Sequence, residues 1–264
     1  MKNNFISILI TNYNKDKFLK KTLKQVSNQK FKNYEIILYD DCSNDDSLRI
    51  IKSFKKIKLI RNLVRKNTSG PLNQIEGIIK VFKKSKGNII CLLDADDGFL
   101  KNKLTQINIF FNKNKYSNCV FNMPQGNYNN FTLKNKNENK HIWPTIFPTS
   151  CISMRRKFFQ KFIHHIERNK FKDLEIDARI TIFSKFFYNE YNIIRQKLTS
   201  YNYDAEGITA NIQRFSIKWW NRRYQAFGYL KIILKKKKQV FTPHLDYFLT
   251  CIFNLFTKIK KNKI

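Results

Sequence analysis

Cysteine is scarce in this chain and forms no paired motif. The five cysteines are scattered over 264 residues, and none belongs to a CxxC pair or to another spacing typical of metal ligands. An odd number of isolated cysteines predicts reduced thiols in a cytosolic protein. The sequence therefore favours neither a cysteine-ligated metal site nor a disulfide-stabilised fold.

Long apolar runs are also lacking. Nowhere do about 18 uninterrupted apolar residues follow one another, so we expect no transmembrane helix. The apolar run at residues 5–11 is too short for a signal peptide, and polar residues follow it directly. We expect a cytoplasmic protein, in which any contact with the inner face of the membrane is peripheral.

Acidic residues are few. The chain has 19 Asp and Glu against 51 Lys and Arg, a formal net charge of +32. Such a charge attracts polyanions, which include nucleic acid, an anionic membrane surface and phosphorylated substrates. The sequence is also rich in Lys, Asn, Ile and Phe, and a general composition bias of this kind would explain the charge without a function. Both interpretations stay open.

The first 115 residues alternate between two periodicities. Apolar runs typical of buried strands and segments with helical spacing follow one another: strands at 5–11, 34–40, 57–62 and 87–94, and helices at 15–29, 45–55, 72–85 and 101–113. Such alternation predicts βαβ units, and hence a parallel sheet covered by helices on both faces. Ser43 and Asp46 predict a capping box for the helix at 45–55.

The second half is less regular. We expect a strand at 116–122, a long loop at 123–150, and helices at 153–167 and 175–188. The predicted organisation is an α/β half at 1–115, a second half of the same domain at 116–213, and a basic, aromatic, helical extension at 214–264.

Carboxylates gather where the predicted strands end. Asp40 and Asp41 end the second strand, and Asp94, Asp96 and Asp97 follow the fourth. In open α/β sheets, ligands bind at the carboxyl ends of the strands. Crowded carboxylates repel one another unless a cation joins them, and Mg²⁺ or Mn²⁺ binds one or two carboxylates together with substrate phosphates. The alternative is that Asp96 or Asp97 simply caps the next helix.

The order and spacing of these motifs resemble those of a known family. The segment 7–47 resembles the opening of family 2 glycosyltransferases, and the segment ending in Asp94-Ala95-Asp96 follows at the usual distance. The matching positions are Thr11, Tyr13, Asn14, Ser27, Gln29, Glu35, Asp40, Asp41, Ser43, Asp45, Asn67 and Gly70. The resemblance is strong over residues 4–115 and weak over 150–190.

This resemblance implies a GT-A fold that binds a nucleotide-diphosphate sugar. It implies that Thr11, Tyr13 and Asp41 surround the base and ribose. It also implies that Asp94 lies near the ribose, and that Asp96 holds the metal ion that bridges the diphosphate. Taken singly, these residues have ordinary roles too: Thr11 in a strand, Tyr13 in loop packing and Asp41 in a turn.

Sugar transfer to a hydroxyl also needs a base. The resemblance implies a carboxylate at the start of a helix that faces the acceptor, and Asp177 fits it best, with Glu175 and Asp173 as competitors. An attack opposite the departing diphosphate would invert the anomeric configuration. The alternative is that Asp177 has no catalytic role and is simply an acid that the helix dipole favours near a helix N-terminus.

The sequence departs from the family pattern in two places. "PLNQIEG" (71–77) replaces the usual Ala-Arg-Asn-x-Gly, which leaves the nucleobase open. The Q-x-x-R-W-like signature of processive synthases is missing, which favours an enzyme that adds one sugar at a time.

The C-terminal extension combines aromatic and basic residues. Trp219, Trp220, Arg222 and Arg223 precede the lysine run at 235–238. Such a segment can lie on an anionic membrane surface. Equally, the aromatic residues can cover the core and leave the lysines solvated. No recognised nucleic-acid module accompanies the segment, so nucleic acid is not an expected partner.

The predicted function is transfer of a sugar from a nucleotide-diphosphate sugar to a glycan or lipid-linked acceptor in surface polysaccharide assembly. Two other classes of protein share some of these features. A nucleotidyltransferase would normally have a glycine-rich loop with Lys or Arg after the first strand, and this chain has none there. A non-enzymatic basic protein would bind nucleic acid or an anionic membrane surface, with the acid cluster serving structure only.

Overall fold

The computed structural model describes residues 4–65, 69–125, 146–202 and 212–261, together with residues 142 and 207, and of residues 257–261 it describes the backbone alone. The predicted alternation of strands and helices is confirmed in the first half. Its elements are β1 (Ile6–Asn12), α1 (Asp16–Ser27), β2 (Tyr34–Asp41), α2 (Ser47–Lys52), β3 (Ile57–Asn62), α3 (Gly70–Lys84), β4 (Ile89–Asp94), β5 (Gly98–Phe99) and α4 (Lys103–Lys113).

The second half completes the sheet and adds helices. Its elements are β6 (Cys119–Gln125), a 3₁₀ turn (Thr149–Cys151), β7 (Ile152–Arg155), α5 (Arg156–His165), α6 (Ile176–Ile182), a π-helical turn (Phe183–Phe187), β8 (Asn192–Ser200), α7 (Ile217–Lys236) and α8 (Leu245–Lys261). The strand order is β3-β2-β1-β4-β7-β6-β8-β5. Strands β3, β2, β1 and β4 are parallel, whereas β7 is antiparallel to both of its neighbours. The sheet is therefore mixed but parallel where the predicted site lies.

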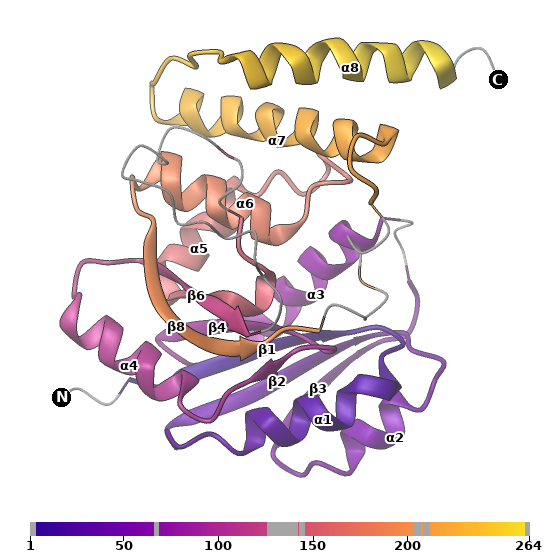
Figure 1. Ribbon diagram of the computed structural model, residues 1–264. Helices are drawn as coiled ribbons and strands as arrows, with labels where there is room; N and C mark the ends of the chain where they lie inside the picture. The colour runs from indigo at the N-terminus through magenta and orange to yellow at the C-terminus, as the bar shows by residue number, and fades with distance from the viewer. Residues whose placement is uncertain are drawn as a thin grey trace.

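Helices cover both faces of this sheet (Figure 1). Alternate residues of β1 face opposite sides because the side chains of a strand alternate. Ile8 and Ile10 pack with Leu23 of α1 in one buried cluster. Leu9 belongs to a second cluster, which α3, α5, α6 and α7 complete. The apolar strand runs of the sequence thus fill two cores, one on each face.

The C-terminal helices form a hairpin at the end of the molecule opposite α1 and α2 (Figure 1). Helix α7 buries Trp220, Phe227 and Tyr229, and the last two belong to the same cluster as the second face of the sheet. These aromatic side chains therefore cover the core, as one of the two interpretations expected. The division of the chain into three parts stays a prediction.

Two local predictions are wrong. Helix α2 begins at Ser47 and has no side-chain cap from Asp46, because Ser43 instead donates its hydroxyl to the buried Asp40 carboxylate, 2.6 Å away. The helix predicted at 153–167 begins as strand β7, since Ile152–Arg155 pairs with β4 and β6. Most of the loop predicted at 123–150 lies outside the described residues, although β6 reaches Gln125.

All five cysteines are free thiols, as expected. In the part of the chain that the structure describes, no helix is both long enough and apolar enough to cross a membrane.

Candidate active site

A cavity of about 350 Å³ lies at the carboxyl ends of β1, β2 and β4. All six predicted site residues line it: Thr11, Tyr13, Asp41, Asp94, Asp96 and Asp177. The first five come from strand ends, and Asp177 comes from the first turn of α6. Because the carboxyl ends of neighbouring parallel strands meet at one edge of a sheet, residues far apart in the sequence share this pocket.

One side of the pocket is built around Arg65. Its guanidinium lies 3.6 Å from the centre of the Tyr13 ring, and its Nε lies 2.9 Å from Oδ2 of Asp41. The other carboxylate oxygen of Asp41 accepts a hydrogen bond of 2.9 Å from Asn62. The stacked ring and guanidinium give two flat surfaces beside a fixed carboxylate, a combination suited to an aromatic base.

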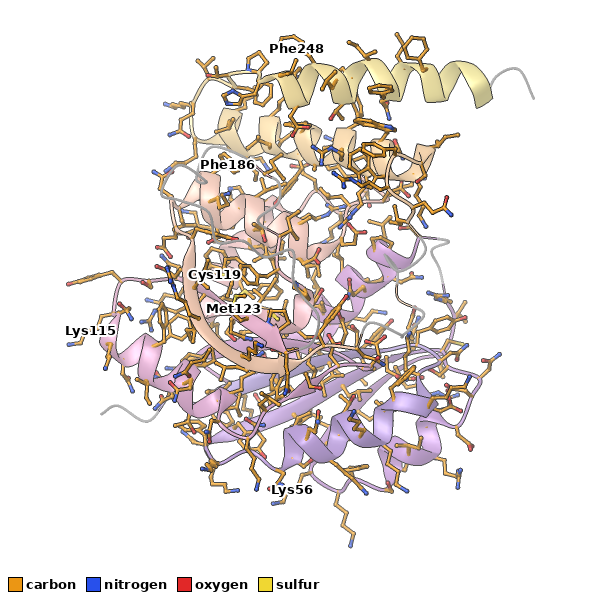
Figure 2. The ribbon with its side chains drawn as sticks, viewed as in Figure 1. Lys56, Lys115, Cys119, Met123, Phe186 and Phe248 are labelled. Carbon is orange, nitrogen blue, oxygen red and sulfur yellow. The ribbon has the colours of Figure 1, made fainter. Side chains whose placement is uncertain are left out.

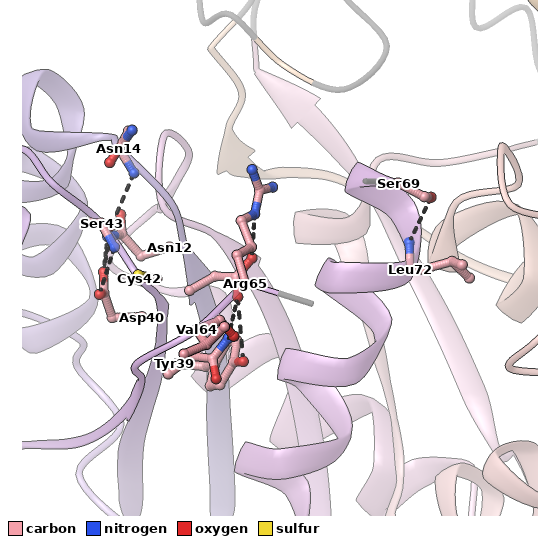
Figure 3. Close-up of polar contacts among 12 residues, drawn as sticks. Asn12, Asn14, Tyr39, Asp40, Cys42, Ser43, Val64, Arg65, Ser69 and Leu72 are labelled. Atoms are coloured by element: carbon pink, nitrogen blue, oxygen red, sulfur yellow. Dashed lines mark hydrogen bonds and ion pairs between the residues drawn. The ribbon is translucent and has the colours of Figure 1, made fainter. Parts of the chain in front are cut away.

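Asp40 has a different role from its neighbour Asp41. It is buried and accepts hydrogen bonds from Asn12 Nδ2 at 2.7 Å and from the hydroxyl and amide of Ser43 at 2.6 and 3.1 Å (Figure 3). Asp40 thus ties the loop after β2 to the end of β1. Cys42, in the loop between Asp40 and Ser43, adopts a φ of 62°, a left-handed conformation that is strained for a residue with a side chain.

Asp94 and Asp97 lie in crowded, largely buried surroundings. Burial and the charges of Asp96, Asp97 and Asp177 raise the pKa of Asp94 well above its usual value. Gln74 donates a hydrogen bond of 2.7 Å to Asp94 and opposes this rise. Burial and the charge of Asp96 also raise the pKa of Asp97 to about 7. Three carboxyls thus meet at this edge, against the two cations Lys15 and Lys103.

Asp96 is paired with Lys15, whose Nζ lies 2.9 Å from its carboxylate. Neither Asp96 nor Asp97 caps α4, which begins at Lys103 after Asn102. The helix-capping alternative for the acid cluster is therefore wrong.

The donor set at this edge fits a hard divalent cation that is shared with a diphosphate. Asp94 and Asp96 supply carboxylate oxygens, and their crowding is the repulsion that a cation relieves. Within the described ranges, no three His, Cys, Asp or Glu side chains are grouped closely enough to hold a metal ion alone. Magnesium commonly binds to fewer carboxylates and completes its shell with phosphate and water.

Asp177 stands in the first turn of α6 and accepts a hydrogen bond of 2.6 Å from the amide of Ala178. Burial, and then the charge of Glu175, raise the pKa of Asp177 to about 7, against the opposing effect of Arg222. Asp177 is therefore both a helix N-terminal acid and a carboxyl in the pocket with a pKa near neutrality, which suits a proton acceptor.

The two competing acids differ in position. Glu175 also lines the pocket, and one of its carboxylate oxygens lies 2.5 Å from Nε of Arg222 on α7. The other oxygen is buried and has no hydrogen-bond partner among the described residues. Asp173 is not one of the lining residues, and its carboxylate accepts hydrogen bonds from Asn221 and Gln225 of α7.

Several pocket residues were not predicted. Arg65 lines the pocket and follows β3, and its place after a strand end is the signal by which the sequence could have identified it. Gln74 lies in the segment that departs from the family pattern. Thr149 and Tyr201 come from distant parts of the chain, and no local signal identifies them. The motif residue Asn67 lies outside the described residues.

Comparison with known proteins agrees with this geometry. The family model "Glycosyl transferase family 2" matches residues 7–186. An uncharacterized glycosyltransferase of Haemophilus influenzae is 25% identical over 97% of this chain and 98% of its own length. WfaP of Escherichia coli, named a UDP-Glc:α-D-GlcNAc-diphosphoundecaprenol β-1,3-glucosyltransferase, is 34% identical over 38% of each chain. Three other bacterial relatives are matched over only 16%, 41% and 16% of their lengths.

Among solved structures, the mannosyltransferase PcManGT of Pyrobaculum calidifontis, in complex with GDP-Man and Mn²⁺, superposes with a TM-score of 0.65. It is 13% identical, and the match covers 98% of this chain and 74% of PcManGT. This likeness shows that the fold is GT-A. The family match favours neither the nucleotidyltransferase nor the non-enzymatic basic protein. The chain belongs to glycosyl transferase family 2.

Proposed function

We propose that this enzyme transfers one sugar from a nucleotide-diphosphate sugar to a hydroxyl group of a glycan or lipid-linked acceptor. The observation that carries the proposal is the single pocket in which a base-stacking side, two strand-end carboxylates and a carboxyl of raised pKa meet. The stacking side suits the base of the donor, the strand-end carboxylates suit its ribose and its metal-bound diphosphate, and the carboxyl of raised pKa suits the acceptor proton.

The donor half of the proposal uses the strand ends. Tyr13 stacks on the base, Asp41 accepts a base N–H, and Thr11 lies beside the base and ribose. Asp94 binds near the ribose, and Asp96 holds a Mg²⁺ or Mn²⁺ ion together with the diphosphate. When bound, that cation offsets the negative charge that develops on the leaving nucleoside diphosphate.

The acceptor half uses Asp177. The acceptor oxygen attacks the anomeric carbon while the bond from that carbon to the diphosphate oxygen breaks, and Asp177 takes the hydroxyl proton. The products are the glycoside and the nucleoside diphosphate. Direct displacement from the opposite face inverts the anomeric configuration.

A role in surface polysaccharide assembly completes the proposal. The name of the relative WfaP gives a diphosphoundecaprenol-linked sugar as its acceptor, which supports a lipid-linked acceptor for this chain as well. We place the enzyme in the cytoplasm, with peripheral contact between residues 214–264 and an anionic membrane.

The test is thermal unfolding of the wild type and of Asp96→Asn with a panel of nucleoside diphosphates, each with and without Mn²⁺. A ligand that binds only the folded state raises the melting temperature by mass action. We expect one nucleotide to raise it in the wild type, with Mn²⁺ increasing the effect, and Asp96→Asn to remove the increase.

The matched control is Asp46→Asn. Asp46 is an exposed acid that is paired with Arg49 away from the pocket, and its variant should respond like the wild type. If no nucleotide raises the melting temperature of the folded wild type, the proposed donor site is wrong.

A further inference from the structure

The outer face of helix α8 is apolar although it is exposed to solvent. Its Leu, Ile and Phe side chains are 41% to 73% exposed: Leu245, Phe248, Leu249, Ile252, Leu255 and Phe256. Because an α-helix makes a turn every 3.6 residues, these positions form one continuous stripe. Phe248, labelled in Figure 2, lies on the side of α8 away from α7. We call these six residues the α8 stripe.

The inner face of the same helix mixes polar residues with Tyr247, which packs against Phe227 and Phe241. Thr250 and Asn254 are buried, and Asp246 forms an ion pair with Arg223 of α7. Trp220 of α7 stacks on Phe253 with ring centres 4.5 Å apart, which adds an apolar contact at the edge of this face. A helix at a protein–water boundary places its apolar side inward, whereas α8 places most of it outward. Water alone is therefore an unfavourable environment for the outer face of α8.

Basic residues flank the α8 stripe at both ends. The exposed lysines 235–238 lie just before the hairpin turn; Lys236 among them pairs with Glu167 at 2.8 Å, and Lys237 lies 5.2 Å from the centre of the Phe187 ring. Val240 and Leu245 follow them as exposed apolar residues. The last turns of α8 contain the sequence Lys258-Ile-Lys260-Lys261. An apolar helix face between lysine clusters suits a bilayer surface, where apolar side chains enter the acyl boundary and lysines meet anionic headgroups.

We propose that the α8 stripe binds the surface of an anionic lipid bilayer, with α8 lying in the plane of the interface. A second copy of the chain fits this face less well. Antiparallel pairing of two stripes would bring lysines 235–238 of one copy next to the lysine-rich end of α8 in the other, and like charges brought together oppose association. An anionic membrane complements both lysine clusters.

The same hairpin reaches the pocket. Arg222 of α7 pairs with Glu175 in the pocket wall, so the element that binds the membrane also contacts the proposed acceptor side. The use of this surface to meet a lipid-linked acceptor rests on the proposed function. The docking itself assigns a surface to the peripheral membrane contact proposed above, and it needs neither donor nor transfer.

The test is sedimentation of the purified chain with vesicles of phosphatidylcholine alone or mixed with phosphatidylglycerol. The variant is the triple substitution Ile252→Gln, Leu255→Gln and Phe256→Gln, which changes exposed side chains and should leave the fold intact. The control is Tyr116→Gln, which alters an exposed aromatic residue after α4. Nucleotide binding and the melting temperature of each variant are measured in parallel.

We expect the wild type and Tyr116→Gln to bind the mixed vesicles, roughly tenfold or more tightly than phosphatidylcholine alone. We expect the triple variant to lose roughly tenfold or more of this affinity while it keeps its nucleotide binding. Equal binding of the wild type and triple variant overturns the proposal. Equal binding of the wild type to both kinds of vesicle also overturns it. So does a wild type that binds no vesicles and is a dimer in analytical ultracentrifugation, if the triple variant is a monomer.

Discussion

The pKa of Asp177 ties the proposed base to pH. A carboxyl accepts a proton only when it is ionised, and burial and the charge of Glu175 raise the pKa of Asp177 to about 7. Arg222, Glu175 and Asp94 are the charged groups that face it. We therefore expect kcat/KM to rise as the pH increases through 7 and to level off above it. A pH profile at saturating metal checks this, and a flat profile across this range would contradict the assignment.

Three conservative variants separate the candidate bases. Asp177→Asn should lower kcat by roughly 10²–10⁴-fold and leave nucleotide binding unchanged. Asp173→Asn is the matched control, because Asp173 interacts with α7 outside the pocket, and its kcat should stay close to wild type. If Glu175→Gln abolishes the pH-dependent rise and Asp177→Asn does not, the base is Glu175.

Cys42 predicts a gain in stability. Its φ of 62° costs free energy in any residue with a Cβ, and glycine adopts this conformation freely. Cys42→Gly should raise the free energy of unfolding by about 0.5–1 kcal/mol, since relief of strain exceeds the extra entropy that glycine gives the unfolded chain. Urea unfolding measures the change. Cys42→Ala keeps the strained backbone, so its free energy of unfolding should not rise. If Cys42→Gly instead lowers the free energy of unfolding, the contact of 3.3 Å from Cys42 Sγ to the Leu63 carbonyl contributes more than the strain costs.

Among the elements, the segment that leads into α6 depends on Arg179. The guanidinium of Arg179 is buried and donates hydrogen bonds to five backbone carbonyls, those of Ile166, Glu167, Lys170, Phe171 and Leu174. Burial lowers the pKa of Arg179 to about 10, so it stays charged at neutral pH. One side chain thus orders the approach to Glu175 and Asp177.

Arg179→Met should therefore be strongly destabilising. It leaves buried carbonyls without donors, at a cost of about 1–3 kcal/mol each before relaxation, so the free energy of unfolding should fall by about 3 kcal/mol or more. Arg179→Lys should rescue it only partly, because an ammonium has three donors and no planar fork. Urea unfolding measures the free energy of unfolding of both Arg179 variants, and Arg61→Met, at an exposed position on β3, is the control. A loss below about 1 kcal/mol would mean that apolar packing holds the segment.

The elements that could be predicted are those with a local signal. Strands β1, β2 and β4 are runs of buried Ile and Leu, and the carboxylates at their ends share one edge because the strands are parallel. Strand β7 has four residues, and pairing with β4 and β6 decides its conformation. Strand β8 is mostly half-buried or exposed, without the alternation that marks a strand. Contacts that depend on the assembled sheet, such as Gln74 with Asp94, leave no trace in local sequence.

For the whole molecule, the net charge of +32 sets an expectation for salt. Like charges on the surface repel one another and destabilise the compact state, and salt screens exposed charges over about 8–10 Å near physiological ionic strength. We expect the melting temperature to rise as NaCl is increased at fixed pH, because screening removes more repulsion than attraction. Differential scanning calorimetry measures the change.

The ion pairs of the pocket work in the opposite direction. Lys15 with Asp96, and Arg222 with Glu175, are mostly buried, so salt weakens them less than it weakens the surface repulsion. A melting temperature that falls with NaCl would show that such attractions outweigh the self-repulsion. Local ion pairs would then decide how the stability responds to salt, although the net charge of the chain stays +32. A melting temperature that rises with NaCl would instead show that repulsion among the surface cations dominates. An anionic surface or a diphosphate that binds these cations would then relieve the same repulsion.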